Sequence, residues 1–134
     1  MSDTLTKPKI KVDADIKKQV KEQEELEQQV IVHCTLHAPA SMTMGVRIWQ
    51  STFLFDKESS HKSKLLHQEN IPLAPSWKDI APGAKFTFTL FFSPLPKSCT
   101  EFHLREVIPV SGGFEVQNIK RNHMDVYRVR IPNY

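Results

Sequence analysis

The sequence predicts a mainly β fold: an antiparallel β-sandwich or barrel of about seven strands, preceded by an N-terminal helical segment. Two observations support this. From residue 29 onward, apolar and polar residues alternate in short segments separated by turn residues, which is typical of half-buried strands. No helical stretches separate these segments with βαβ spacing, which disfavours a parallel α/β fold. With 134 residues, the chain is the size of one ordinary domain.

Residues 1–28 are expected to form a region distinct from the β domain at 29–134. Residues 1–8 are small and polar, which is typical of a terminal tail. Residues 13–28 are rich in helix formers and contain no Gly or Pro, so a helix is expected there. Its apolar residues would lie in one narrow stripe: Val12, Ile16, Val20, Leu26 and Val30. Such a stripe can dock on its own domain or on a partner.

The clearest expected strand is 85–96, where Phe86, Phe88 and Leu90 alternate with polar residues. The other segments with a strand pattern are 29–36, 45–55, 100–109, 112–122 and 125–131. Two stretches lack the pattern. Residues 56–64 are charged and Ser-rich, which predicts a turn or loop. Residues 65–83 hold three prolines and predict an irregular connection with one short strand at most.

Composition excludes some classes of protein and leaves others open. Hydrophobic residues make up 40% of the chain and charged residues 25%, which is normal for a globular domain. The net charge of +3 permits nucleic-acid binding without demanding it. No apolar run is long enough for a transmembrane helix, and no signal core opens the chain, so the cytoplasm is the expected location for a chain without a trimmed leader. The two cysteines are then expected to be free thiols.

The motif H-C-x-x-H at residues 33–37 is the stretch most similar to a metal site. On a helix, residues four apart lie about 6 Å from each other and can share a zinc ion. On a strand they lie about 13 Å apart, so His33 and His37 could not chelate one ion, and Cys34 would face inward. We therefore expect no metal site here. The question left open is whether His33 or His37 meets His103 across the sheet.

The run "FTLFFSPLPKSCTEFHLRE" (88–106) resembles a segment of small bacterial immunoglobulin-like β-sandwich domains, and "NIKRNHMDVYRVRI" (118–131) is similar to their closing strands. The resemblance implies a fold and an accessory or interaction role, and no activity. The immunoglobulin disulfide is not expected. Its template places a Tyr two residues before the second Cys, where this chain has Lys97, and Cys99 lies in a proline-bounded turn.

The chain contains no glycine-rich phosphate loop, CxxC, HExxH or nucleophile elbow, so the sequence predicts neither an enzyme nor a cofactor. Glu106 is unusual because it continues the apolar face of its strand and would need a partner if buried. Arg47, Arg121 and Arg128 are the candidate partners, and a structural salt bridge is favoured over a catalytic role. Tyr127 faces away from Arg128 and its neighbour Arg130, which disfavours a nucleic-acid surface there.

The leading functional hypothesis is a non-enzymatic interaction or assembly module that acts through protein–protein contacts or self-association. Its expected binding residues are the outward Phe91, the N-terminal stripe and two edge-strand arginines: Ile16, Val20, Leu26, Phe91, Arg128 and Arg130. A free sheet edge could also recruit a partner strand. The alternative hypothesis is a small-ligand or carbohydrate-binding module that uses Trp77 and Trp49.

Overall fold

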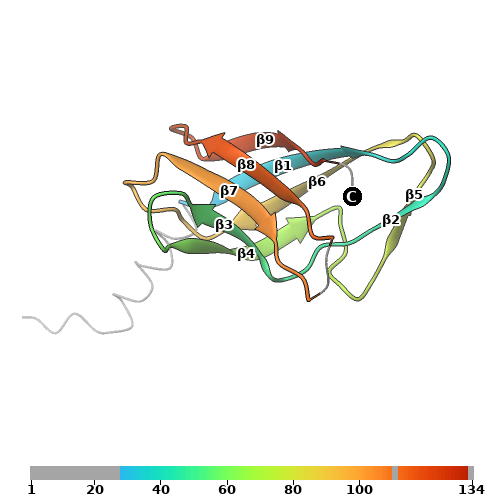
Figure 1. Cartoon of the computed structure of the whole chain (residues 1–134), viewed down its shortest axis with the longest axis horizontal. Helices are drawn as coiled ribbons and strands as arrows, with labels where there is room; N and C mark the ends of the chain where they lie inside the picture. The colour runs from blue at the N-terminus through green and yellow to red at the C-terminus, as the bar shows by residue number, and fades with distance from the viewer. Residues whose placement is uncertain (1–27, 110–111, 133–134) are drawn as a thin grey trace, which may run out of the picture.

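The computed structural model describes residues 28–109 and 112–132, and this part of the chain is mainly β (Figure 1). It contains nine strands. They are β1 (Val30–His37), β2 (Met44–Val46), β3 (Thr52–Asp56), β4 (Lys62–Glu69), β5 (Lys78–Ile80), β6 (Lys85–Phe92), β7 (Glu101–Glu106), β8 (Glu115–Lys120) and β9 (Val126–Arg130). The expected helix over residues 13–28 and the N-terminal stripe lie outside the described residues, apart from the stripe's last member, Val30.

Seven strands form one sheet in the order β8-β7-β3-β4-β6-β1-β9, and β2 and β5 form a separate pair. The sheet is mixed, because β9 runs parallel to β1, whereas its other strand pairs are antiparallel. The expectation of a wholly antiparallel arrangement is therefore wrong at this edge. The sheet curls until it is nearly closed (Figure 1). The ring centroids of Phe102 on β7 and Tyr127 on β9 lie 4.9 Å apart, near the two ends of the sheet.

The core follows directly from the alternation in the sequence. In β1, every second residue from Val30 to Leu36 is buried, and the same period holds in β6 from Phe86 to Phe92. The two strands pair over their full length, so these side chains share the interior. Cys34 and Cys99 are buried free thiols, which confirms that no disulfide links them.

Two segments differ from the sequence-based expectation. The stretch 45–55 is not one strand: it divides into β2, which pairs with β5, and β3, which joins the large sheet. The stretch around 62–69 forms β4 near the middle of the sheet, although it carries few apolar residues. Its inward positions hold Ser63 and Leu65, and the hydroxyl of Ser63 donates to the carbonyl of Pro94. A register shift between Leu65 and His67 then breaks the alternation.

No helix in the part of the chain that the structure describes is long and apolar enough to cross a membrane.

Candidate functional site: a pocket between two tryptophans

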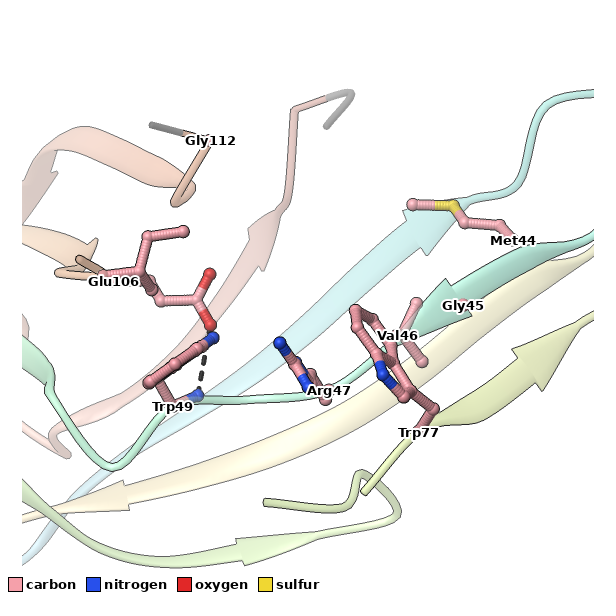
Figure 2. Close-up of a pocket in the computed structure, with 9 residues that line it drawn as sticks. Met44, Gly45, Val46, Arg47, Trp49, Trp77, Glu106 and Gly112 are labelled. Carbon is pink, nitrogen blue, oxygen red and sulfur yellow. Dashed lines mark hydrogen bonds between the residues drawn. The ribbon is translucent and has the colours of Figure 1, made fainter. Parts of the chain in front are cut away.

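Both tryptophans of the chain line one pocket, at the end of the domain where β2 and β5 pair (Figure 2). The pairing places Gly45 opposite Asp79 and Val46 opposite Lys78. Beyond β2, the amide of Ile48 donates to the carbonyl of Pro72 at 2.9 Å. The loop that carries Trp77 is therefore held alongside the segment that carries Trp49. These backbone contacts bring together two residues that lie far apart in the sequence.

Arg47 lies between the two indole rings (Figure 2). Its guanidinium carbon is 3.8 Å from the ring centroid of Trp77 and 5.3 Å from that of Trp49. Nη1 of Arg47 also donates a hydrogen bond of 3.2 Å to the carbonyl of Pro75. A guanidinium stacked on indole faces is attracted by the negative ring face. The three side chains therefore hold one another in place.

Gly45 allows Trp77 to lie close against β2. A Cβ added at Gly45 would come within 3.2 Å of the Trp77 ring, which is tighter than an ordinary van der Waals contact. The side chain of Trp77 is nevertheless 60% exposed, a large value for a tryptophan. One part of its ring thus rests on the protein, and the rest faces solvent at the mouth of the pocket.

Glu106 forms the inner wall of the pocket and is only 5% exposed. Its Oε2 accepts a hydrogen bond of 3.2 Å from the backbone amide of Trp49 (Figure 2). Burial raises the pKa of the Glu106 carboxyl, and this effect outweighs the lowering by backbone hydrogen bonds and by the charge of Arg47. The predicted salt bridge does not form among the described residues. Arg47 is the nearby cation, but it acts on Glu106 through its field.

Apolar side chains complete the cavity, whose volume is about 310 Å³, and the pocket is partly open to solvent. The remaining lining residues are Met44, Val46, Ile108 and Gly112. A cavity of this size is at the small end of the range for ligand sites. Apolar walls with a few convergent polar groups are the usual composition of such sites. The arrangement can accept one ring-sized ligand.

The structure brings only some of the predicted binding residues together. Trp77 and Trp49 share the pocket described above. Phe91 lies on the outer face of β6, where its ring centroid is 5.4 Å from that of His67. Arg128 and Arg130 are exposed on the edge strand β9, as expected. Neither group contributes to the pocket.

The histidines of the H-C-x-x-H motif do not meet His103. Nδ1 of His33 is hydrogen-bonded to the hydroxyl of Thr89 on β6 at 2.9 Å, whereas Nδ1 of His103 accepts from the amide of Asn118. Three strands separate β1 from β7 in the sheet order. Among the described residues, no group of three or more His, Cys, Asp or Glu side chains could hold a metal ion.

Arg121 pairs with Asp125 and not with Glu106, the partner that the sequence suggested for it. Its Nε and Nη2 donate to the two carboxylate oxygens of Asp125 at 2.6 and 3.0 Å. Its Nη1 donates to the carbonyls of Pro96 and Cys99. The hydroxyl of Tyr127 donates to the same carboxylate at 2.8 Å. This network ties the start of β9 to the loop before β7, whereas Glu106 lies at the other end of β7.

Sequence reasoning missed Arg47 as the centre of the site. The segment "GVRIW" did carry a signal, since Arg47 and Trp49 lie two residues apart and alternate with buried Val46 and Ile48. It did not show that Trp77 would pack on the other side.

Together, the nearly closed mixed sheet and the partly open aromatic pocket define a mainly β domain with a candidate ligand site. The chain matches no family model, no curated protein and no solved structure.

Proposed function

We propose that this chain is a non-enzymatic binding module that holds a small ligand, with carbohydrates as the first class to test, in the pocket between Trp49 and Trp77. The observation that carries the proposal is the position of Arg47 between the two indole rings. Flat apolar rings next to fixed hydrogen-bond donors match a sugar, which has an apolar C–H face and a rim of hydroxyls. Trp77 offers the exposed ring surface.

The polar groups of the pocket suit a neutral, hydroxyl-rich ligand. An arginine side chain has five N–H donors, and Arg47 gives one of them to a carbonyl of the described chain. The other donors can reach ligand oxygens. Glu106 is buried and its pKa is raised, so its carboxyl can both donate and accept once it is protonated. A strongly cationic ligand is disfavoured because Arg47 stands at the centre.

The same composition supports a binding role over catalysis. Glycoside cleavage normally uses two carboxyl groups on either side of the bond. Among the described residues that line the pocket, Glu106 is the single carboxylate. The resemblance to bacterial immunoglobulin-like domains implies an accessory role and is in keeping with this proposal.

Tryptophan fluorescence tests the proposal directly, because both tryptophans of the chain line the pocket. Mono- and oligosaccharides would be titrated into the full chain and into Trp77→Ala, with Leu66→Ala as a matched control. Leu66 is an exposed apolar residue outside the pocket. We expect a saturable change in the wild type and in the control, and its loss in Trp77→Ala. Absence of a response to every sugar, or an equal response in Trp77→Ala, would contradict the proposal.

A second candidate function, binding through protein–protein contacts, is favoured by the edge strand β9. Within the described sheet, β9 pairs with β1 on one side and presents its other edge with Arg128 and Arg130 exposed. A strand of a second copy of the chain, or of another protein, could add there by β-augmentation. Light scattering after size exclusion tests self-association. A monomer at all concentrations, in the wild type as in an Arg128→Glu variant, would argue against this edge as a self-association surface.

A further inference from the structure

Two aromatic rings face outward from the middle of the sheet, on a side of the domain that the pocket does not use. Phe53 and Phe55 lie on β3 and are half-buried, while the intervening Leu54 is in the core. The two ring centroids are 5.9 Å apart, in an edge-to-face arrangement. Large aromatic rings on the outer face of a sheet commonly mark a surface that something covers.

Positively charged side chains on both neighbouring strands, β4 and β7, flank these two rings. The register places Phe53 between Lys64 on β4 and Arg105 on β7, and it places Phe55 opposite Lys62. Nζ of Lys62 lies 4.4 Å from the ring centroid of Phe53. We call these five residues the outer patch: Phe53, Phe55, Lys62, Lys64 and Arg105.

The cations of the outer patch lack an acidic partner in the described chain. The ion pairs among described residues join Lys57 to Glu101, His67 to Glu69 and Arg121 to Asp125. Glu115 lies opposite Arg105 in the strand register, without a described ion pair to it. The outer patch is therefore an aromatic surface with unneutralised positive charge, which fits an acidic and partly apolar occupant.

The chain itself enters the sheet near this surface. β1 begins at the end of the sheet where β3 ends and β4 begins (Figure 1). Val30 pairs with Phe92, which pairs on its other side with Leu65, the neighbour of Lys64. Phe53 thus lies three strands across the sheet from the start of β1, a distance of about 14 Å. Residues 13–27, if helical as the sequence predicts, would be about 22 Å long.

The composition of residues 13–27 complements the outer patch. Residues 22–27 read "EQEELE", with four glutamates and no Lys or Arg, and residues 13–27 together carry six Asp and Glu against three Lys. Ile16, Val20 and Leu26 supply apolar side chains on the expected stripe. By contrast, the chain from residue 28 onward carries twelve Lys and Arg against eight Asp and Glu. An acidic amphipathic segment is thus joined directly to a domain that presents a basic aromatic surface.

We propose that residues 13–27 of this chain dock on the outer patch. The glutamates of residues 22–27 lie beside Lys62 and Lys64 on β4, and Val20 and Ile16 cover the rings of Phe53 and Phe55, one strand further from β1. The contact is made within one chain, because the segment is long enough to reach. It makes the N-terminal stripe a second layer over one face of the sheet, independent of any ligand in the pocket.

Zero-length carbodiimide cross-linking of the full chain tests this contact, because it joins a carboxylate to an amine only when they touch. We expect peptides that link Lys62 or Lys64 to a glutamate of residues 22–27. A mixture of heavy- and light-isotope chains separates links within a chain from links between chains. Links found only between chains would assign the outer patch to a second copy and overturn the proposal, as would the absence of such links.

Charge reversal provides the second test, read out by hydrogen exchange of residues 13–27. The variant Lys62→Glu/Lys64→Glu should speed exchange in this segment by about tenfold, because two attractive contacts become repulsive. Adding Glu24→Lys/Glu25→Lys should restore much of the protection. Lys85→Glu is the matched control, since Lys85 is exposed at the opposite end of β6, opposite His37. Equal exchange in the wild type, Lys62→Glu/Lys64→Glu and Lys85→Glu would overturn the proposal.

Discussion

The guanidinium carbon of Arg47 lies over the indole of Trp77, only 3.8 Å from the ring centroid. This contact joins β2 to the loop before β5 and forms the centre of the pocket (Figure 2). A cation on an indole face contributes about 0.5–1 kcal/mol at an exposed site. The hydrogen bond from Arg47 to the carbonyl of Pro75 adds a second attachment. The two contacts together determine where Trp77 lies.

We therefore expect Arg47→Ala to release Trp77. The free energy of unfolding should fall by roughly 1 kcal/mol, from the loss of the stacking and of one hydrogen bond. Tryptophan emission should also change, because both fluorophores lose the neighbouring charge. Urea denaturation and emission spectra measure the two effects. Lys97→Ala is the control, because Lys97 is exposed on the loop before β7 and does not line the pocket. Unchanged emission in Arg47→Ala would mean that the stacking does not persist in solution.

Gly113 is expected to be the glycine least tolerant of substitution. A Cβ added there would collide with the backbone carbonyl oxygen of Glu106. The amide of Glu106 also donates to the carbonyl of Phe114, so the two segments cannot separate without losing a hydrogen bond. Gly113→Ala should therefore destabilise the domain by about 2 kcal/mol or more. Gly45→Ala is the comparison, because its Cβ meets only the exposed ring of Trp77 and should cost less.

Thermal or urea denaturation of the two glycine variants distinguishes these cases. Equal stability in Gly113→Ala and the wild type would show that the turn between β7 and β8 differs from the described geometry.

The sequence predicted the parts of the fold that depend on strand periodicity. β1 and β6 were predictable because alternate residues such as Val32 and Phe88 are large and apolar, and the pleat sends them all inward. β4 was not predictable, because Ser63 faces the core and is satisfied by a hydrogen bond to Pro94, a residue distant in sequence. Local propensity contains no information about that bond.

The candidate site was predictable in its parts but not as an assembly. The residue type alone makes Trp77 and Trp49 candidate binding residues. The alternation of apolar and polar residues in β7 places Glu106 on the apolar face of that strand. Their meeting depends on the pairing of β2 with β5 and on the parallel bridge between Ile48 and Leu73. Such contacts depend on the path of the whole chain, which one sequence does not show.

Both cysteines should be unreactive in the folded protein. Burial raises the pKa of the Cys34 thiol to about 12, and burial and hydrogen bonding with Asp56 raise that of Cys99 to about 11. Since the thiolate is the reactive form, few thiolates exist at pH 8. We expect a colourimetric disulfide reagent to modify neither thiol in buffer and both in denaturant. Rapid labelling of one thiol in buffer would indicate local opening around that residue.

The ion pair between Arg121 and Asp125 should make stability depend on pH in the acidic range. Burial opposes ionisation of Asp125, but hydrogen bonds from Arg121 and Tyr127 prevail and lower its pKa. A carboxyl with a lowered folded-state pKa stabilises the fold above its unfolded-state value of about 3.9, and this stabilisation is lost as the pH falls through the folded-state value. Asp125→Asn should therefore cost about 2 kcal/mol at pH 7, from the loss of hydrogen bonds to a charged group, and this cost should shrink as the pH falls below about 3.9.

Urea titrations of the wild type and Asp125→Asn at several pH values measure this difference. A gap between the two proteins that does not shrink at all below about pH 3.9 would mean that the loss is unrelated to the charge of Asp125.

Glu106 should show the opposite dependence on pH, because burial raises its pKa. Below its unfolded-state pKa of about 4.3, the carboxyl is neutral in both states and contributes no pH-dependent term. As the pH rises above that value, the Glu106 carboxyl ionises in the unfolded chain before it ionises in the folded one. The free energy of unfolding therefore falls until the pH passes the raised folded-state pKa. Glu106→Gln keeps an oxygen that can accept from the Trp49 amide, and it removes this penalty.

We therefore expect Glu106→Gln to match the wild type at pH 3.5 and to be more stable at pH 7, measured by urea denaturation at each pH. Glu106→Ala is the control, because it leaves the Trp49 amide without its acceptor and should cost about 1–3 kcal/mol at both pH values. If Glu106→Gln is instead less stable at pH 7 and the gap closes at pH 3.5, the ionised carboxylate is favourable in the fold. The field of Arg47 would then outweigh burial, and the pocket would hold a charged pair.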